Sequence, residues 1–265
     1  MKTLFISHVF SSNNNLKYYE YIPSFIYGVL ETQENAFVKI LIDRKLPKKI
    51  KKALDLIENR NFEIVENFKI DIECSLISKP QLMKSIRWLL GSSYFKGFDY
   101  AYIGDVDFIM YDDKITELHL ANCEKLGLPY SNSIRPNGKQ MAGLHFIKCE
   151  EYFKTIDKTI NYILKDNKID KFMGRITAED KRNEHFLYEL IKNCIGFNDL
   201  ETEITHGNRM CFRPHHGIHL GVLRSKEMKL VRIPKYVNDK IFKEIQLIIK
   251  NKEIQKVINY EIHYK

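Results

Sequence analysis

Hydrophobic and polar positions along the first hundred residues predict strands and helices in alternation. Short apolar runs, which are typical of buried strands, cover four stretches: residues 2–10, 36–43, 62–68 and 98–107. Between them, apolar residues recur at the three- and four-residue spacing of a helix in residues 18–32, 47–60 and 81–91. Strands that alternate with helices predict an α/β fold: a mixed, mostly parallel sheet flanked by helices, in a single domain.

The second half of the chain is less regular. Its hydrophobic pattern predicts a strand over 139–148 and helices over 149–168 and 177–194, the latter with Thr177 as a cap. A strand with a loop is predicted over 210–226. Residues 119–138 have the polar, loop-rich character of a connection. We expect one domain over residues 1–225, followed by a basic amphipathic C-terminal segment over residues 226–265.

Composition narrows the class of protein. Hydrophobic residues make up 44% of the 265 residues, enough for a full core. The formal charge of +8 favours an anionic partner, namely nucleic acid, a phosphate-bearing ligand or an acidic membrane face, although solubility alone also accounts for it.

The cysteines and the apolar runs bear on location. Five cysteines are scattered without a C-x-x-C pair, which argues against a disulfide framework or a zinc site and favours a reducing cytosol. No apolar stretch approaches 18 residues, and the N-terminal run is too short for a signal peptide. We therefore expect a cytoplasmic protein that does not span a membrane.

Two carboxylates end the fourth predicted strand. Asp105 and Asp107 follow an apolar run and precede Phe108, Ile109 and Met110. Ligands of doubly wound sheets bind at the carboxyl ends of strands, and residues two apart on a strand share a side. The pair is therefore a candidate site for a hard cation such as Mg²⁺ or Mn²⁺. The alternative is a solvated turn after a strand, because a bare D-x-D arises often by chance.

These residues lead to a resemblance. The segment "FDYAYIGDVDFIMYDD" resembles the D-x-D segment of GT-A glycosyltransferases, which use nucleotide-sugar donors, and "KSIRWLL" resembles their arginine-bearing helix at Arg87. The segment "KQMAGLHFIK" resembles the A-G strand of the retaining blood-group-type galactosyl- and N-acetylgalactosaminyltransferases. Their D-E-x-x-L motif reads Asn183-Glu184-His185-Phe186-Leu187 here, so Glu184 alone inherits the catalytic role.

A late histidine-rich segment resembles a second pattern. Glycogenin-like enzymes place a metal-binding histidine before a basic residue, in the order H-x-x-G-x-x-K. The fit here departs from that spacing and is best with His219, Gly221 and Arg224, while His215 and His216 remain alternatives. Histidines at a polar strand end are otherwise often surface residues.

The resemblance implies a set of site residues. Asp105, Asp107 and His219 would hold Mn²⁺ or Mg²⁺, Glu184 would act at the reaction centre, and Gly143 and His145 would meet the acceptor. The donor would contact a larger group: His8, Val9, Arg87, Asp105, Val106, Asp107, Arg224 and Lys226. Two structural alternatives stay open. His145 could instead be a histidine of the core, and Glu184 could be an ordinary charged residue on the solvent-facing side of a helix.

The function that follows is metal-dependent transfer of a hexose from a nucleotide-diphosphate donor, expected to be a UDP-sugar. The acceptor would be a glycan or a lipid-linked sugar in surface polysaccharide synthesis, with a lean towards retention of configuration. The basic tail suits an anionic membrane face, which would make the protein peripheral on the inner leaflet, or it packs on the domain as an ordinary amphipathic helix.

Two other classes of protein fit parts of the sequence. A nucleic-acid-binding protein would fit the charge, but the lysines are scattered and no RNP, KH or helix-turn-helix signature occurs. A metal-dependent nucleotidyltransferase or phosphotransferase also uses paired aspartates, but the Gly-rich phosphate loop that usually accompanies them is missing. We therefore expect a nucleotide-sugar partner and no nucleic acid.

Overall fold

The chain forms two compact units, each assembled from separate segments. The structure is a computed structural model that describes residues 1–11, 16–135, 139–165, 168–174, 176, 182–200, 216–221, 223 and 233–264. The first unit comprises Met1–His8, Lys69–Gly104 and Thr116–Pro214. The second unit comprises Val9–Phe68, Asp105–Ile115 and His215–Lys265.

Four strands form the sheet of the first unit. They lie in the order β1 (Thr3–Val9), β4 (Tyr100–Ile103), β7 (His145–Lys148) and β6 (Tyr130–Ser131). Strands β1 and β4 are parallel, with Ile6 opposite Ile103, whereas β7 runs antiparallel to β4 and places His145 opposite Ile103. Strand β6 is antiparallel to β7. The side chains of β1 and β4 are almost entirely buried, as expected of strands covered on both faces.

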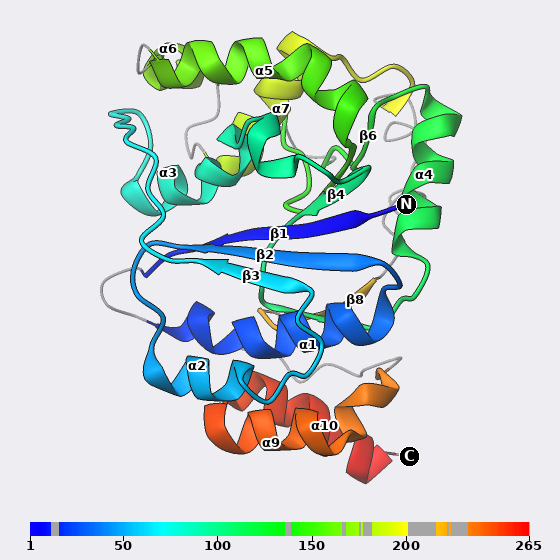
Figure 1. The fold of residues 1–265 in the computed structure, drawn as a ribbon. Helices are drawn as coiled ribbons and strands as arrows, with labels where there is room; N and C mark the ends of the chain where they lie inside the picture. The colour runs from blue at the N-terminus through cyan, green and yellow to red at the C-terminus, as the bar shows by residue number, and fades with distance from the viewer. Residues whose placement is uncertain are drawn as a thin grey trace. The chain divides into compact units, whose positions relative to one another are not determined.

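The helices of the first unit pack through buried side chains. They are α3 (Lys79–Ser85), α4 (Ile115–Leu126), α5 (Cys149–Lys165), α6 (Ile169–Met173) and α7 (Asn183–Cys194), with 3₁₀ turns η2 (Ile86–Leu89) and η3 (Ser92–Phe95). In α5 the buried residues include an apolar stripe at helical spacing: Tyr152, Phe153, Ile156, Ile160 and Ile163. Helix α5 packs against α6 and α7, and α3 packs against α7 (Figure 1).

The second unit contains two pairs of strands and the C-terminal helices. Strands β2 (Ala36–Ile42) and β3 (Phe62–Val65) are parallel, and β5 (Phe108–Met110) is antiparallel to β8 (Gly217–His219). The helical elements are η1 (Lys17–Tyr21), α1 (Ile22–Thr32), α2 (Lys48–Leu54), η5 (Lys235–Asn238), α9 (Lys240–Ile249) and α10 (Lys252–Tyr264). Helix α1 packs on β2 and β5, and α9 packs on α1 and α2.

The α/β prediction is confirmed. Strands of mixed direction, parallel for β1 with β4 and β2 with β3 and antiparallel for β4 with β7, β6 with β7 and β5 with β8, are combined with helices in each of the two units. The predicted strand over 139–148 is shorter than expected, because regular pairing begins only at His145. Residues 177–181, including the predicted cap Thr177, lie outside the described residues. The division of the chain at residue 225 stays a prediction.

The loop predicted over residues 119–138 is wrong, because helix α4 continues to Leu126. Its buried positions are Ile115, His119, Asn122, Cys123 and Leu126, which have helical spacing. Two of these buried positions, His119 and Asn122, are polar. Both side chains contact Ser131: His119 Nδ1 lies 2.8 Å from Ser131 Oγ, and Asn122 Nδ2 donates to the same oxygen at 2.8 Å. A polar core contact therefore hid the helical period from a hydrophobic pattern.

Candidate functional site

The two aspartates lie in a bend between β4 and β5, not on a strand. Strand β4 ends at Ile103, where the Gly104 amide still donates to Ile6 O at 3.1 Å and its carbonyl accepts a bond from Ser7 Oγ at 2.6 Å. A Cβ at Gly104 would lie 2.7 Å from Leu144 Cδ2, so a larger residue at this strand end would require the Leu144 side chain to move. The bend that begins here turns the side chains of Asp105 and Asp107 toward a common point.

Pairing of β5 with β8 adds a histidine to this pair. The antiparallel register places His219 opposite Phe108, and the Leu220 amide donates to Asp107 O at 2.9 Å. The ligand atoms of Asp105, Asp107 and His219 all lie within 4.8 Å of one another, and His219 Nε2 is 3.7 Å from Asp107 Oδ1. Asp107 is buried, Asp105 is half-buried and His219 is exposed, so the cluster opens to solvent on one side.

Two glycines allow this approach. A Cβ at Gly217 would lie 2.1 Å from Ile109 O, and one at Gly221 would lie 2.6 Å from His219 Cε1 and 3.5 Å from Asp107 Oδ2. The Gly221 amide donates to His219 Nδ1 at 3.1 Å, so the imidazole accepts at Nδ1 and carries its proton at Nε2. Ligation of a metal through Nε2 would require that proton to move to Nδ1, and Nδ1 could then no longer accept the bond from the Gly221 amide.

The cluster fits a divalent cation. Two carboxylates and one imidazole supply oxygen and nitrogen donors that Mn²⁺ accepts, and three ligands leave further positions open. A buried carboxylate such as Asp107 also requires nearby positive charge or hydrogen bonds. The arrangement therefore agrees with the site predicted for Mn²⁺ or Mg²⁺, and it does not distinguish the two ions.

The other predicted residues of the late segment lie apart from the cluster or outside the described residues. His216 is buried, and its Nδ1 lies 3.2 Å from Asp112 Oδ2. His215, Arg224 and Lys226 lie outside the described residues. Of the histidines that the structure describes, His219 is therefore the one that joins the two aspartates.

A second polar cluster lies in the first unit at the start of α7. Asn183 is buried, and its side chain accepts a bond from Arg87 Nη2 at 3.2 Å and donates to Gln81 Oε1 at 3.1 Å and to Glu184 Oε2 at 2.8 Å. The guanidinium of Arg87 stacks on Trp88, 4.4 Å from the ring centre. Asn183 thus connects the predicted residues Arg87 and Glu184.

The Glu184 carboxylate is partly exposed and held on two sides. One oxygen accepts from Asn183 and the other lies 3.8 Å from Arg135 Nη2, while the Glu184 carbonyl accepts from the Met141 amide at 3.2 Å. Sequence reasoning missed Gln81 and Arg135. No sequence signal marks them, because each reaches the start of α7 from a distant segment.

Four further predicted residues occupy sites of different accessibility. His8 is half-buried, with Nδ1 3.0 Å from Met83 O. The side chains of Val9 and Val106 are buried, so only their backbones could meet a ligand. Gly143 is buried in a bend before β7.

His145 has no exposed surface in the structure. Asn132 Nδ2 donates to its Nδ1 at 2.9 Å, and its ring stacks on Tyr130 and meets Tyr152 edge-on. Burial lowers the pKa of His145 to about 3, so the imidazole is neutral. These surroundings match the alternative of a core histidine, and a role toward the acceptor stays a prediction.

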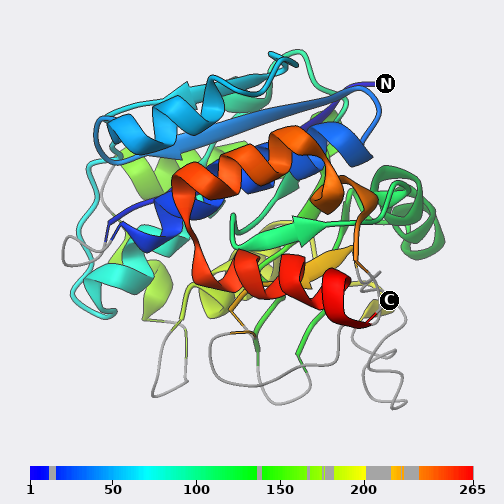
Figure 2. The same ribbon diagram turned by 90° about the horizontal axis from the view of Figure 1, so that it is seen from below.

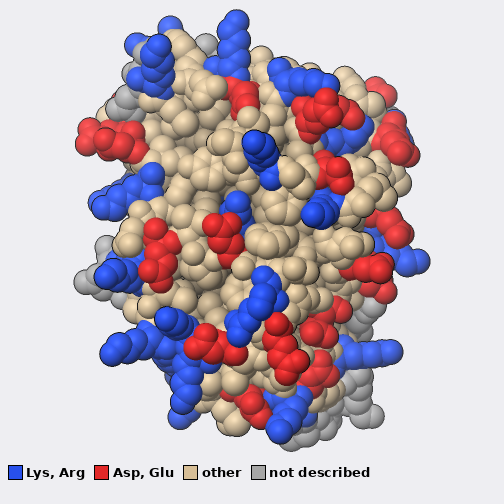
Figure 3. Space-filling model, viewed as in Figure 1, with Lys and Arg blue, Asp and Glu red and all other residues tan. Residues whose placement is uncertain are grey.

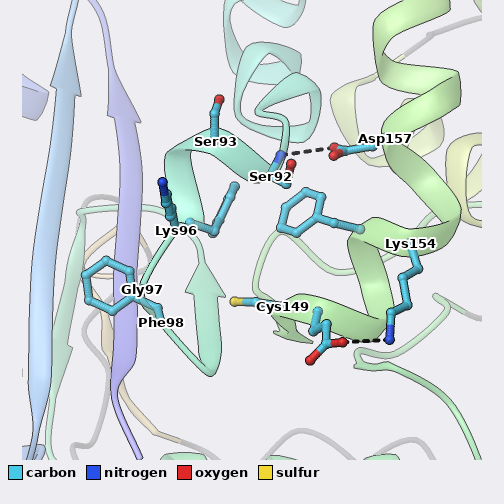
Figure 4. Close-up of a pocket in the computed structure, with 11 residues that line it drawn as sticks. Ser92, Ser93, Lys96, Gly97, Phe98, Cys149, Lys154 and Asp157 are labelled. Atoms are coloured by element: carbon cyan, nitrogen blue, oxygen red, sulfur yellow. Dashed lines mark hydrogen bonds and ion pairs between the residues drawn. The ribbon is translucent and has the colours of Figure 1, made fainter.

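A hollow of about 510 Å³ lies elsewhere in the first unit, between η3 and the start of α5 (Figure 4). None of the predicted site residues lines it. Three of its charged residues contact neighbours, since Asp157 accepts from the Ser92 amide at 3.0 Å and Lys154 lies 2.7 Å from Glu150. Burial raises the pKa of the Cys149 thiol to about 12, which leaves it protonated and a poor nucleophile.

Charges of both signs are interspersed on the face of the molecule that Figure 3 shows. That face lacks the uniform basic field typical of proteins that bind nucleic acid nonspecifically. None of the helices in the described part of the chain has the length and hydropathy that crossing a bilayer requires.

Comparisons with known proteins return structures but no sequence relatives. No protein-family model and no curated protein matches the chain. An active-site mutant of the galactosyltransferase LgtC is 12% identical over 73% of this chain and 71% of its own, with a TM-score of 0.47. Mouse xyloside xylosyltransferase 1 is 9% identical over 72% of this chain and 82% of its own, with a TM-score of 0.47.

A third structure covers nearly the whole chain. The glycosyltransferase GlyE of Streptococcus pneumoniae TIGR4 is 14% identical over 98% of this chain, with a TM-score of 0.44, and the chain spans 63% of its length. All three proteins are glycosyltransferases, the class that the sequence resembles. TM-scores below 0.5 describe a remote likeness in fold.

Proposed function

We propose that the chain is a metal-dependent glycosyltransferase that moves a sugar from a nucleotide-diphosphate donor to an acceptor hydroxyl. The observation that carries the proposal is the convergence of Asp105, Asp107 and His219 within 4.8 Å, in a bend at the end of a sheet strand. A carboxylate pair with an imidazole and open positions is suited to a cation that also binds phosphate oxygens.

The chemistry of sugar transfer explains why such a site is needed. Cleavage of the bond between the sugar and the diphosphate leaves negative charge on the departing phosphate oxygens. A bound divalent ion would neutralise that charge without a proton transfer. Three protein ligands would leave coordination positions open on the ion, and phosphate oxygens of the donor would fill them. Arg224 and Lys226 are the proposed further contacts to the diphosphate.

Glu184 is the proposed catalytic carboxylate. Positive charge develops at the anomeric carbon as the leaving group departs, and a fixed carboxylate stabilises it or attacks it. Asn183 and Arg135 restrict the orientation of that carboxylate in the structure. A carboxylate held in one orientation avoids reorganisation during the reaction, which supports this assignment.

The finer parts of the proposal follow from the sequence resemblance. We propose a UDP-sugar donor, with His8, Val9, Arg87 and Val106 among its contacts, and an acceptor that is a glycan or a lipid-linked sugar. We also propose that the protein acts in surface polysaccharide synthesis, at the cytoplasmic face of a membrane.

A donor panel tests the function. Purified protein is incubated with UDP-, GDP- and TDP-sugars, with and without Mn²⁺, and release of the nucleoside diphosphate is measured. We expect metal-dependent release from at least one donor, and a loss of at least 100-fold in Asp107→Asn. Asp113→Asn is the matched control, because it removes an exposed carboxylate nearby that lies outside the cluster.

Three results would overturn the proposal. The first is full activity in Asp107→Asn, and the second is an equal loss in Asp113→Asn. The third is release of pyrophosphate from a nucleoside triphosphate with no turnover of any nucleotide-sugar, which would indicate a nucleotidyltransferase. Mn²⁺-dependent thermal stabilisation, measured in parallel, reports metal binding separately from transfer.

A further inference from the structure

Helix α2 in the second unit exposes a dense group of lysines. It buries Ile50, Ala53 and Leu54 against its neighbours. The exposed positions in and before it are all lysines: Lys45, Lys48, Lys49, Lys51 and Lys52. Lys49 lies 3.4 Å from Glu20, whereas Lys48, Lys51 and Lys52 form no ion pair with any residue that the structure describes.

Helix α9 packs beside α2 and exposes a second basic stripe. Its buried side chains include Phe242, Ile245 and Ile249. Its exposed positions follow helical spacing and continue into its C-terminal cap: Lys240, Lys243, Leu247 and Lys250. Leu247 is 70% exposed, a large apolar side chain among these lysines, and the partly exposed Glu244 lies 3.8 Å from Lys240.

Most of the excess charge of the chain resides in these two stretches. Residues 45–58 hold five lysines and two acids, and residues 235–256 hold six lysines and three acids. Their combined charge is +6, against +8 for the whole sequence. Figure 2 looks onto the helices α2, α9 and α10 of the second unit, which lie on the side facing the viewer. We call the exposed side of α2 and α9 the basic face.

We propose that the basic face docks on an anionic lipid bilayer. Lysines attract a diffuse negative surface as point charges, whereas arginine is the usual residue for bidentate contacts to individual phosphates. Leu247 can enter the headgroup region while the lysines around it stay in contact with lipid phosphates. No large aromatic side chain is exposed among the described residues of α2 and α9, so base stacking on nucleic acid lacks a platform.

This docking is expected to be reversible and dependent on salt. A lysine close to an anionic leaflet contributes about a fivefold gain in partition coefficient, and screening reduces it within a Debye length. Several lysines acting together with one leucine therefore give binding that fades as ionic strength rises. The proposal is independent of sugar transfer, because it rests on the exposed side of α2 and α9 alone.

Vesicle sedimentation tests the proposal. The full chain is mixed with vesicles of phosphatidylcholine, with or without about 30% phosphatidylglycerol, at about 0.05 M and about 0.5 M salt. We expect binding to the anionic vesicles at low salt only. The triple variant Lys51→Gln, Lys52→Gln, Lys243→Gln should lower the partition coefficient about 100-fold, and Leu247→Ser about fivefold.

A matched variant distinguishes the effect of the basic face on vesicle binding from the effect of net charge. Lys158→Gln, Lys165→Gln, Lys171→Gln also removes three exposed lysines, but from α5 and α6 of the first unit. It should change vesicle binding less than threefold. All substitutions are at exposed positions, so an unchanged thermal midpoint serves as the check on folding.

Several results would overturn the proposal. One is an equal loss of binding in the two triple variants, which would make net charge the cause. Another is equal binding to vesicles with and without phosphatidylglycerol. A third is retention of a mixed-sequence oligonucleotide by a protein that ignores both kinds of vesicle, which would assign the basic face to nucleic acid.

Discussion

Single residues decide the geometry of the metal cluster. Gly221 illustrates this, because its α-carbon lies so close to the His219 ring that a methyl group has no room. Its backbone does not use the left-handed region, so an alanine would fit the local conformation and act only through the contact with His219. The effect of that methyl group on metal binding therefore measures how much the site depends on the position of the His219 imidazole.

Gly221→Ala should weaken binding of Mn²⁺ by at least tenfold, because the added Cβ displaces a ligand. Isothermal titration with Mn²⁺ checks this. In a protein that already carries His219→Ala, the same substitution should have almost no effect, since the displaced group is gone. An equally large loss in both backgrounds would show that Gly221 acts through something other than His219.

His145 makes stability depend on pH. Its pKa falls from about 6.5 in the unfolded chain to about 3 in the folded protein, because burial disfavours the charged ring. The unfolded chain therefore binds the additional proton as the pH falls below 6.5. Stability is complete above that pH and is lost progressively toward pH 3, by about 2 kcal/mol at pH 5.

Urea unfolding at pH 7 and pH 5 tests this expectation. In His145→Gln the difference in unfolding free energy between the two pH values should shrink by about 2 kcal/mol. Glutamine keeps an acceptor for Asn132 Nδ2 and does not titrate. An unchanged pH dependence in this variant would mean that the ring of His145 is not the group responsible.

At the scale of elements, packing overrides local propensity. Helix α1 contains Gly28, a residue that weakens a helix by about 1 kcal/mol relative to alanine. A Cβ at that position would lie 2.3 Å from Tyr236 Oη and 2.9 Å from its Cζ. Tyr236 cannot move easily, because its hydroxyl donates to Met110 O at 2.7 Å and its ring packs against Tyr27 and Phe242.

Gly28→Ala should therefore destabilise the protein by about 1–2 kcal/mol, although helix propensity alone predicts the opposite sign. Thermal or urea unfolding measures the change. In a Tyr236→Phe background the hydroxyl that makes the nearest contact is missing, so the same substitution should have a smaller effect. A stabilised Gly28→Ala variant would show that α1 and η5 are not packed as closely as the structure describes.

At the scale of the whole molecule, each unit depends on distant parts of the chain. The second unit combines residues before Phe68 with the C-terminal helices. Helix α9 buries Phe242, Ile245 and Ile249 completely, and it packs on α1 and α2. Burial of three such side chains contributes about 5–9 kcal/mol, comparable to the total stability of a domain.

Deletion of residues 226–265 should therefore abolish cooperative folding of the second unit. Circular dichroism and thermal unfolding of the truncated chain check this. Deletion of residues 261–265 alone is the control, and it should leave a cooperative transition, because the buried residues of α9 and the start of α10 are kept. A fully folded chain ending at residue 225 would support the predicted domain boundary there.

Local patterns in the sequence were sufficient for the alternation of strands and helices, the α/β class, and the carboxylate pair at a strand end. These features depend on neighbours in the chain and on periodicity. Local patterns did not predict helix α4, because His119 and Asn122 face the core there and break the hydrophobic pattern. A polar core contact is visible only once its partner, Ser131, is in place.

Tertiary structure alone decided which histidine joins the aspartates. Three histidines stand within five residues in the sequence, and the register of β5 with β8 brings His219 to Asp107, whereas His216 turns to Asp112. The same holds for Gln81 and Arg135 at the start of α7, and for the complete burial of His145. The physical reason is shared: these contacts join residues far apart in the chain, and only strand pairing and helix packing set their distances.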